Sequence, residues 1–241
     1  MRPEFALEKA LQLEAQGADI IDIGAESTRP DATQVTFEEE INRLFPVLDE
    51  ILKLVTAPVS IDTTKAKVAD LALTKGVSIV NDVSGLKDDP EMAHVVHQHQ
   101  AGVVVMHRRG TPQTMQNLTH YENLIEEVKD ELSESIAVAR KAGISHEQIA
   151  IDPGLGFSKT ADQNFEIVRS LSEFKCFERP IVVGASRKSF LGKVTGKGTR
   201  ESVFASAAIA ALLVERGAHV LRVHDVSAIR DAVFVTGEIV Q

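Results

Sequence analysis

The sequence predicts a parallel α/β protein, a barrel of the TIM (β/α)8 type from which one strand is missing. Short apolar runs rich in Ile and Val alternate with amphipathic helical stretches, as expected for parallel strands buried on both faces. No segment rich in Pro, Gly or Ser divides the chain, so we expect a single domain over residues 1–241. Polar residues follow every apolar run. This favours a barrel over a doubly wound sheet, which gathers ligands only at its switch point.

The hydrophobic pattern places each element in turn. Seven strands are predicted, at Ala18–Ile23, Ala57–Ile61, Val77–Val80, Gly102–Met106, Gln148–Ile151, Pro180–Val183 and Ala218–Val223. The predicted helices are Phe5–Gln16, Phe37–Val55, Thr64–Lys75, Pro90–Gln100, Tyr121–Ala142, Ala161–Leu171, Arg200–Arg216 and Val226–Val240. Thr36 and Glu39 form a capping-box pattern, and Gly76, Gly143 and Gly217 each follow a predicted helix end.

Composition narrows the class of protein. The 26 Lys and Arg residues against 35 Asp and Glu give a net charge of −9, which argues against binding to nucleic acid or to an anionic membrane. No apolar run approaches the roughly 18 residues of a membrane span, and the N-terminus has no apolar signal-peptide core. Cys176 is the only cysteine, which excludes a disulfide framework. We therefore expect a cytoplasmic protein.

The polar residues after the strands form a chemically consistent set, because the C-terminal strand ends of a barrel converge on one mouth. Asp62, Asn81 and Asp152 offer acceptors for the ring N–H and NH2 groups of a flat heterocycle. Cations and donors suited to a phosphorylated group and a carboxylate are also present, namely Arg29, Arg187, Lys188, Arg222 and His224. The expected substrate is an electron-rich nitrogen heterocycle with an anionic tail.

At these positions the sequence resembles the dihydropteroate synthase family of pterin-binding barrels. The matching stretches follow the family's order over nearly the whole chain: Asp22–Pro30, Ile61–Thr63, Val80–Val83, Met106-His107, Asp152–Phe157, Ser186–Gly192 and Arg222–Val226. Asp-Pro-Gly alone is a weak signal. Ser186–Phe190 together with Glu26–Pro30 and Arg222–Val226 is a strong one.

The resemblance implies condensation of 6-hydroxymethyl-7,8-dihydropterin diphosphate with 4-aminobenzoate, with Mg²⁺, in a homodimeric target of sulfonamides. It implies catalytic roles for Asp62, Asp152, Lys188, Arg222 and His224. It implies a pterin site made by Asp62, Asn81, Met106, Asp152, Phe157, Gly184 and Lys188. It implies an aminobenzoate and diphosphate site made by Thr28, Arg29, Pro30, Arg187, Ser189, Arg222, Val223 and His224.

The sequence departs from the family at its start. The family begins with a strand and a loop that holds an Asn ligand of Mg²⁺, and neither precedes Met1 here, so no metal ligand is assigned. We expect a seven-stranded open barrel in which Ala18–Ile23 and Ala218–Val223 are unpaired edges, with the pterin slot mostly present and turnover severely impaired. The alternative is a chain cut from a longer functional protein.

Two other functions remain open. A methyltetrahydrofolate methyltransferase-like barrel would share Asp62, Asn81 and Asp152, but it has no diphosphate and so no need for Arg29, Lys188 and Arg222 together. The other is an inactive pterin-binding fragment, which would bind pterin without turnover.

Several residues also have purely structural interpretations. Asp62 could cap the helix from Thr64, Asp225 the last helix, and Asp22 could be a partner for a neighbouring strand end. Arg108 and Arg109 are interpreted as a surface loop pair. The histidines at 94, 97 and 99 are interpreted as solvated helix surface, since their spacing does not match helical zinc sites.

The helix Arg200–Arg216 carries more apolar residues than one core-facing stripe requires. The excess predicts a subunit contact.

Overall fold

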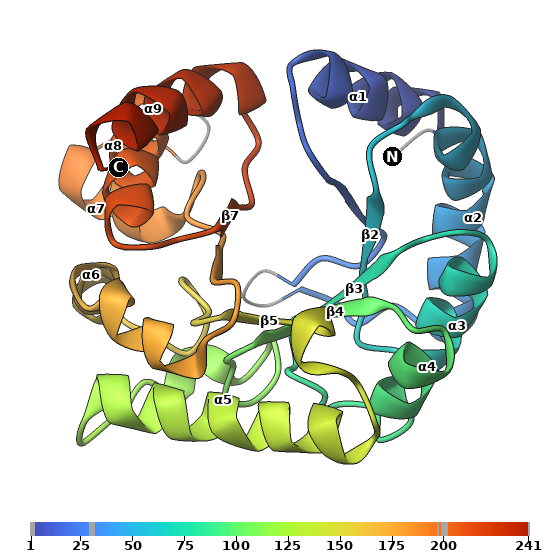
Figure 1. The fold of residues 1–241 in the computed structure, drawn as a ribbon, viewed down its shortest axis with the longest axis horizontal. Coiled ribbons are helices and arrows are strands. Elements are labelled where there is room, and N and C mark those ends of the chain that lie inside the picture. Colours follow the sequence, from blue (N-terminus) through green and yellow to red (C-terminus); the bar gives the residue numbers. More distant parts are fainter. Residues whose placement is uncertain (1–2, 29–31, 197, 199–201, 241) are drawn as a thin grey trace. The chain divides into compact units, whose positions relative to one another are not determined.

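The structure is a computed structural model that describes residues 3–28, 32–196, 198 and 202–240 (Figure 1). All seven predicted strands are present among these residues. The chain divides into two compact units, one made by Met1–Met106 and Glu134–Ile149, the other by His107–Ser133 and Ala150–Gln241. That the two units form one domain stays a prediction.

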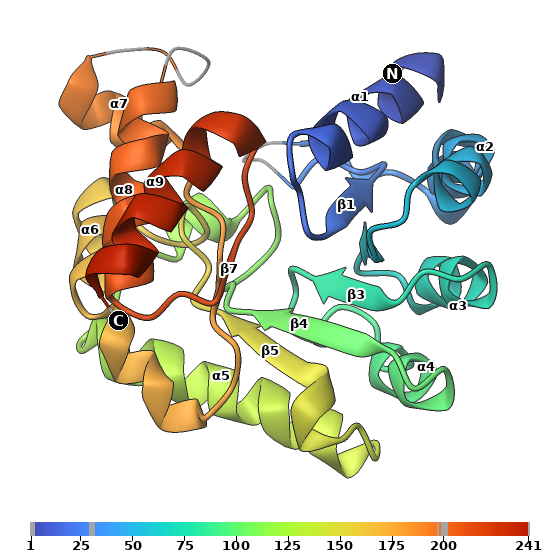
Figure 2. The ribbon, with the colours of Figure 1, turned by 45° about the horizontal axis from the view of Figure 1, so that its top comes forward.

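The first unit is built on four parallel strands. They are β1 (Ile21–Gly24), β2 (Val59–Asp62), β3 (Ile79–Asp82) and β4 (Gly102–Met106), and they lie side by side in this order. The helices are α1 (Pro3–Ala15), α2 (Phe37–Leu54), α3 (Ala66–Thr74) and α4 (Met92–Gln98). In Figure 2, α2, α3 and α4 cover the same face of the sheet, as expected where a helix joins each pair of parallel strands.

The sequence explains α2 and the centre of the sheet. The Thr36 hydroxyl accepts from the Glu39 backbone N–H and the Glu39 carboxylate accepts from the Thr36 N–H, so the predicted capping box is confirmed. Leu44, Leu48 and Ile51 form a buried stripe at helical spacing. The Ile61 side chain in β2 is fully buried, as expected for a parallel strand covered on both faces.

The second unit contains shorter strands and most of the irregular structure. Among its described residues lie the 3-10 helices η1 (Met115–Asn117) and η3 (Leu171–Phe177), whereas η2 (His146–Gln148) belongs to the first unit. The other elements are α5 (Leu124–Lys141), β5 (Ile149–Asp152), α6 (Ala161–Arg169), β6 (Val182–Val183), α7 (Ser189–Thr195), α8 (Val203–Glu215), β7 (Val220–Leu221) and α9 (Val226–Ile239). β6 pairs with β7 in parallel, and α8 packs against α9 (Figures 1 and 2).

The predicted boundaries are wrong by a few residues where local signals are weak. α3 begins at Ala66 rather than Thr64, and α6 ends at Arg169, after which the chain tightens into η3. Within the described residues, no helix combines the length and the apolar character that crossing a membrane requires.

Candidate active site

Two predicted acceptors of the first unit lie on adjacent strands. Asp62 ends β2 and Asn81 lies in β3 directly beside it in the register, and both side chains are buried. Gly24, at the end of β1, is the partner of Asp62 on the other side. A Cβ atom at Gly24 would lie only 3.0 Å from Asp62 Cβ, so the glycine leaves room for the carboxylate. Predicted acceptors therefore do meet at this sheet edge.

The capping interpretation of Asp62 is wrong. The N-cap position of α3 is Lys65, three residues further on, and the backbone N–H of Ala66 donates to Asp89 Oδ2 at 2.8 Å. The interpretation of Asp22 as a partner for a strand end is confirmed, because the Asn81 amide nitrogen lies 3.5 Å from Asp22 Oδ2. Asp62 is therefore a buried carboxylate without a capping role.

Asp82 is a structural residue that the sequence alone did not single out. Its carboxylate accepts from the Ser84 backbone N–H and hydroxyl and from the Leu86 N–H, at 2.7–2.9 Å. Burial raises the pKa of Asp82 to about 6, although these hydrogen bonds oppose the shift. It fixes the turn after β3, in which Leu86 has a φ of 65°.

Three further predicted residues of this unit, Thr28, Arg29 and Pro30, lie in the segment after β1. Thr28 is half-buried. Arg29 and Pro30 lie outside the described residues.

In the second unit, Asp152 ends β5 and is buried at 7% exposure. Its Oδ1 accepts from the Gly154 N–H at 2.7 Å, and its carbonyl oxygen accepts from the His107 N–H at 2.9 Å. Burial raises the pKa of Asp152, whereas the Gly154 hydrogen bond and the charges of Lys188, Lys159 and Arg222 oppose the rise. The Asp152 carboxylate therefore lies within the electrostatic reach of several cations.

Lys188 lies beside Phe157, a predicted wall of the pterin slot. Its Nζ is 4.3 Å from the centroid of the Phe157 ring, within cation–π range. Lys188 occupies the N-cap position of α7 but makes no side-chain cap hydrogen bond there. The structure therefore brings Lys188, Phe157 and Asp152 together, as predicted.

Arg187 is held by Asp225, which was expected to cap the last helix. Its Nε and Nη2 donate to the two carboxylate oxygens of Asp225 at 2.9 and 2.5 Å. Asp225 occupies the N-cap position of α9, but its side chain makes no cap hydrogen bond, so the predicted capping role is wrong. The guanidinium expected at the aminobenzoate site is thus oriented by Asp225.

The other predicted residues of this unit surround the ends of β6 and β7. Gly184 follows β6, and a Cβ atom there would lie 3.7 Å from Arg222 Cβ. Arg222 and His224 are exposed, Val223 is half-buried, and Ser189 at the start of α7 is exposed. His224 Nδ1 lies 3.2 Å from the Ser186 hydroxyl. Met106, by contrast, ends β4 in the first unit and is buried.

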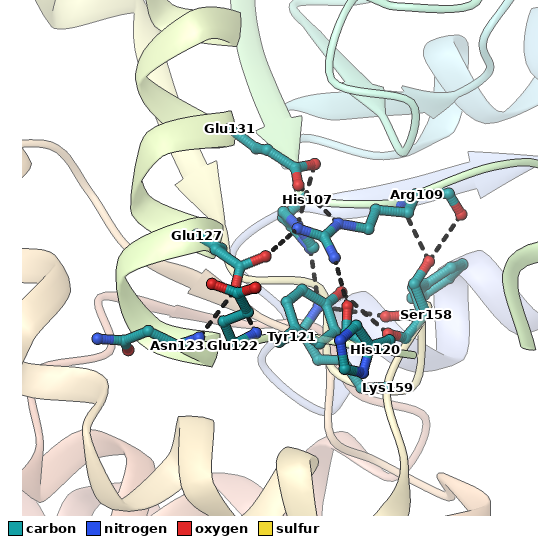
Figure 3. A network of polar contacts seen from close by, with 11 residues as sticks. His107, Arg109, His120, Tyr121, Glu122, Asn123, Glu127, Glu131, Ser158 and Lys159 are labelled. Carbon is teal, nitrogen blue, oxygen red and sulfur yellow. Dashed lines mark hydrogen bonds and ion pairs between the residues drawn. The ribbon is translucent and has the colours of Figure 1, made fainter. Parts of the chain in front are cut away.

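A polar network that the sequence did not predict surrounds His107 (Figure 3). Arg109 donates to Glu127 at 2.8 Å and to Glu131 at 2.6 Å, and its guanidinium lies 3.9 Å from the Tyr121 ring centroid. Arg108 is 4% exposed, so the interpretation of the two arginines as a surface pair is wrong. In the sequence, Glu127 and Glu131 are four residues apart and so share one helix face, and this spacing was a signal from which the network could have been predicted.

Comparisons with known proteins identify the family to which this chain belongs. The family model described as pterin binding enzyme matches residues 2–224. A dihydropteroate synthase of Synechocystis sp. is 45% identical over 224 residues, covering 92% of this chain and 78% of the relative. The chain belongs to the dihydropteroate synthase family.

Solved structures of dihydropteroate synthases confirm the predicted fold class, a TIM-type α/β barrel. The Anaplasma phagocytophilum enzyme with bound 6-hydroxymethylpterin-monophosphate matches with a TM-score of 0.94 at 33% identity, covering 99% of this chain and 95% of that one. The Xanthomonas albilineans enzyme with 4-aminobenzoic acid matches with a TM-score of 0.93 at 37% identity, covering 98% and 85%.

In the described part of the chain, no group of three or more His, Cys, Asp or Glu residues could hold a metal ion. His94 and His97 are exposed, and His99 lies 2.7 Å from Asp70 Oδ1, so the surface interpretation of this histidine group is confirmed.

Proposed function

We propose that this protein is a dihydropteroate synthase, which joins 6-hydroxymethyl-7,8-dihydropterin diphosphate to 4-aminobenzoate and releases pyrophosphate. The observation that carries the proposal is the chemistry of the strand ends. Asp62, Asn81 and Asp152 are buried acceptors, whereas Arg222 and His224 are exposed donors. A heterocycle rich in N–H groups needs the first kind of residue, and a diphosphate needs the second.

The chain's own side chains can carry out the binding and charge stabilisation of this reaction. Asp62, Asn81 and Asp152 would accept hydrogen bonds from the pterin ring. Arg222, His224 and Lys188 would stabilise the negative charge that grows on the departing diphosphate. In the family, the diphosphate leaves before the amine attacks, so the two carboxylates would also stabilise the positive pterin methyl group. No protein nucleophile is required.

The aminobenzoate site is the second part of the proposal. Thr28, Pro30, Arg187 and Ser189 would shape it, by resemblance to the family. The two hydrogen bonds from Arg187 to Asp225 would orient the guanidinium there. Because sulfonamides resemble 4-aminobenzoate, we propose the same residues as the sulfonamide site.

We propose that Mg²⁺ binds together with the diphosphate group of the substrate. The described residues offer no three-ligand protein cage for it. Mg²⁺ often binds through substrate phosphates and retained waters. No step of the reaction is assigned to the ion here.

The proposal extends to assembly and location. Phe204 and Leu212 on α8 are 86% and 47% exposed, and Phe234 and Ile239 on α9 are 55% and 76% exposed. Apolar side chains of this size favour burial against a second copy, so we propose a homodimer. The acidic net charge and the single cysteine support a cytoplasmic location.

Pyrophosphate release tests the proposal against its alternatives. The purified protein, at micromolar concentration so that slow turnover is also detected, is supplied with the pterin diphosphate and 4-aminobenzoate. Release that depends on both substrates supports synthase activity. Pterin binding by calorimetry without release would indicate a binding protein, and methyl transfer from methyltetrahydrofolate would indicate the methyltransferase alternative.

A further inference from the structure

Lys159 is a buried cation that the proposed reaction does not use. Its residue is 3% exposed. Its Nζ lies 2.8 Å from His107 Nδ1, and both residues are labelled in Figure 3. The same Nζ lies 3.1 Å from the Gly154 carbonyl oxygen and 3.1 Å from the Phe157 carbonyl oxygen. An ammonium group has three hydrogens and no acceptor, so each hydrogen has a partner here. These hydrogen bonds offset part of the cost of burying the charge, although burial still lowers the pKa of Lys159 to about 7.

Two of those partners belong to the turn that follows β5. This turn needs unusual backbone, with φ of 72° at Gly154, 83° at Gly156 and 51° at Ser158. A Cβ atom at Gly154 would lie 2.0 Å from the His107 carbonyl oxygen, so the two segments touch closely. Glycine adopts such angles readily, so only Ser158 carries backbone strain. The Lys159 ammonium donates to two carbonyl oxygens of this turn, those of Gly154 and Phe157.

The same turn carries the predicted pterin contacts. The Gly154 N–H donates to Asp152 Oδ1, and Phe157 is the ring beside Lys188. The His107 N–H donates to the Asp152 carbonyl oxygen. Lys159, His107 and the backbone of 152–157 are therefore joined by hydrogen bonds into one connected set, which reaches the Asp152 carboxylate through the Gly154 N–H.

The His107 ring is fixed from its other side. Its Nε2 lies 3.3 Å from Glu131 Oε2, and the Arg109 guanidinium holds the second oxygen of that carboxylate. Burial would raise the pKa of Glu131, but His107 and Arg109 together lower it to about 2. The ring therefore lies between a carboxylate on its Nε2 side and the Lys159 amino group on its Nδ1 side.

From these contacts we propose that Lys159 is a positioning residue of the pterin site, which acts through His107 and the 153–157 turn to hold Asp152 and Phe157 in place. The inference rests on the proposed function, because Asp152 and Phe157 have this binding role only if the protein binds a pterin. The positive charge of Lys159 also favours the ionised form of Asp152, the form that accepts two hydrogen bonds from the ligand.

The first test is Lys159→Met, which keeps a flexible, unbranched side chain that is slightly shorter, but removes the three donors. Calorimetry with 6-hydroxymethyl-7,8-dihydropterin diphosphate should show a Kd raised by about 10- to 100-fold. The KM for 4-aminobenzoate should change by less than about twofold, because aminobenzoate binding does not depend on Asp152. The matched control is Lys141→Met, at an exposed lysine on α5, which should change neither value.

A second pair of variants decides the matter if Lys159→Met does not fold. His107→Asn keeps an acceptor near the position of Nδ1, whereas His107→Leu removes it. The proposal expects His107→Asn to bind the pterin within about fivefold of the unmodified protein, and His107→Leu to bind it at least about tenfold more weakly than His107→Asn. Equal affinities for the two variants would contradict the proposal.

The outcomes separate this inference from the proposed function. If the unmodified protein neither binds the pterin diphosphate nor releases pyrophosphate, the proposed function fails. If it does both and Lys159→Met binds the pterin normally, or loses affinity for both substrates equally, the positioning role of Lys159 is wrong.

Discussion

The strand ends of the two units differ in how their carboxylates are surrounded. In the first unit, Asp82 is held by a hydroxyl and backbone N–H groups, and Lys65 is shared between Glu26 and Glu40. In the second unit, Asp152 lies within the electrostatic reach of Lys159, Lys188 and Arg222.

This difference suggests a division of tasks. Neutral donors can orient a carboxylate, but they do little for negative charge that appears during a reaction. Cations positioned beside that charge stabilise it much better. Changes in the first unit should therefore act mainly on pterin affinity, and changes in the second on turnover as well.

The largest effect is expected for the cations of the second unit. Lys188→Ala or Arg222→Ala should lower kcat by about 100- to 1000-fold, because each removes a cation from the departing diphosphate. Folding should change little, since Lys188 is half-buried and Arg222 is exposed. Pyrophosphate release at saturating substrates measures this.

Lys193→Ala, at an exposed lysine on α7, is the control for these variants. It should keep normal turnover. Full activity of both Lys188→Ala and Arg222→Ala would place the diphosphate site elsewhere.

A smaller effect, and of a different kind, is expected for the first unit. Asp62→Asn should raise the Kd for the pterin by about 10- to 100-fold, because a ring donor loses its charged acceptor. At saturating pterin, kcat should fall less than it does for Lys188→Ala. Calorimetry and turnover together measure the split.

Asp19→Asn, at an exposed carboxylate of the same unit, is the matched control and should bind normally. Unchanged pterin affinity in Asp62→Asn would remove Asp62 from the site. A loss of kcat equal to that of Lys188→Ala would erase the division between the units.

How far the sequence predicted this site depends on the kind of contact. Asp62, Asn81 and Asp152 were found because they follow apolar runs, and burial of a strand fixes where it ends. Lys159 was missed because its partner His107 is 52 positions away, and no local pattern joins them. The Arg187–Asp225 pair, 38 positions apart, was missed for the same reason.

The same distinction explains the errors about single residues. Asp at the start of a helix is commonly a cap, so Asp225 was predicted to be one. A bidentate guanidinium is a stronger partner for a carboxylate than a backbone N–H, and the Asp225 carboxylate binds the Arg187 guanidinium instead of capping the helix. The positions of site residues along the chain were therefore predictable from the sequence, whereas their hydrogen-bond partners could be identified only from the folded structure.

The network of the second unit should also appear in acid stability. The pKa of Glu131 is lowered to about 2 in the folded protein from an ordinary value of 4.5. Its stabilising contribution is then fully present above about pH 4.5 and is lost as the pH falls toward 2. Allowing for partial exposure, it amounts to about 2 kcal/mol of the free energy of unfolding.

Glu131→Gln should remove this dependence. Urea unfolding between pH 5 and 2 should show a flatter fall in stability for Glu131→Gln than for the unmodified protein. Glu134→Gln, at an exposed residue three positions further along α5, should keep the full dependence of stability on pH. An unchanged slope in Glu131→Gln would mean that the carboxylate is not held by Arg109 and His107 in solution.

The smallest effect on catalysis is expected at the exposed apolar stripe of α8. Phe204, Ala208 and Leu212 are exposed and follow one another at i, i+4 spacing, so they share a helix face. If this face is covered by a second copy, Phe204→Asp should place a charge in an apolar contact and convert the dimer to a monomer. Turnover should stay within about twofold, because α8 contributes no residue to the proposed site. Light scattering at micromolar concentration measures the mass, with Phe5→Asp, at an exposed phenylalanine on α1, as the control that should remain dimeric. A monomeric unmodified protein, or a dimer that persists in Phe204→Asp, would show that α8 is not the subunit contact.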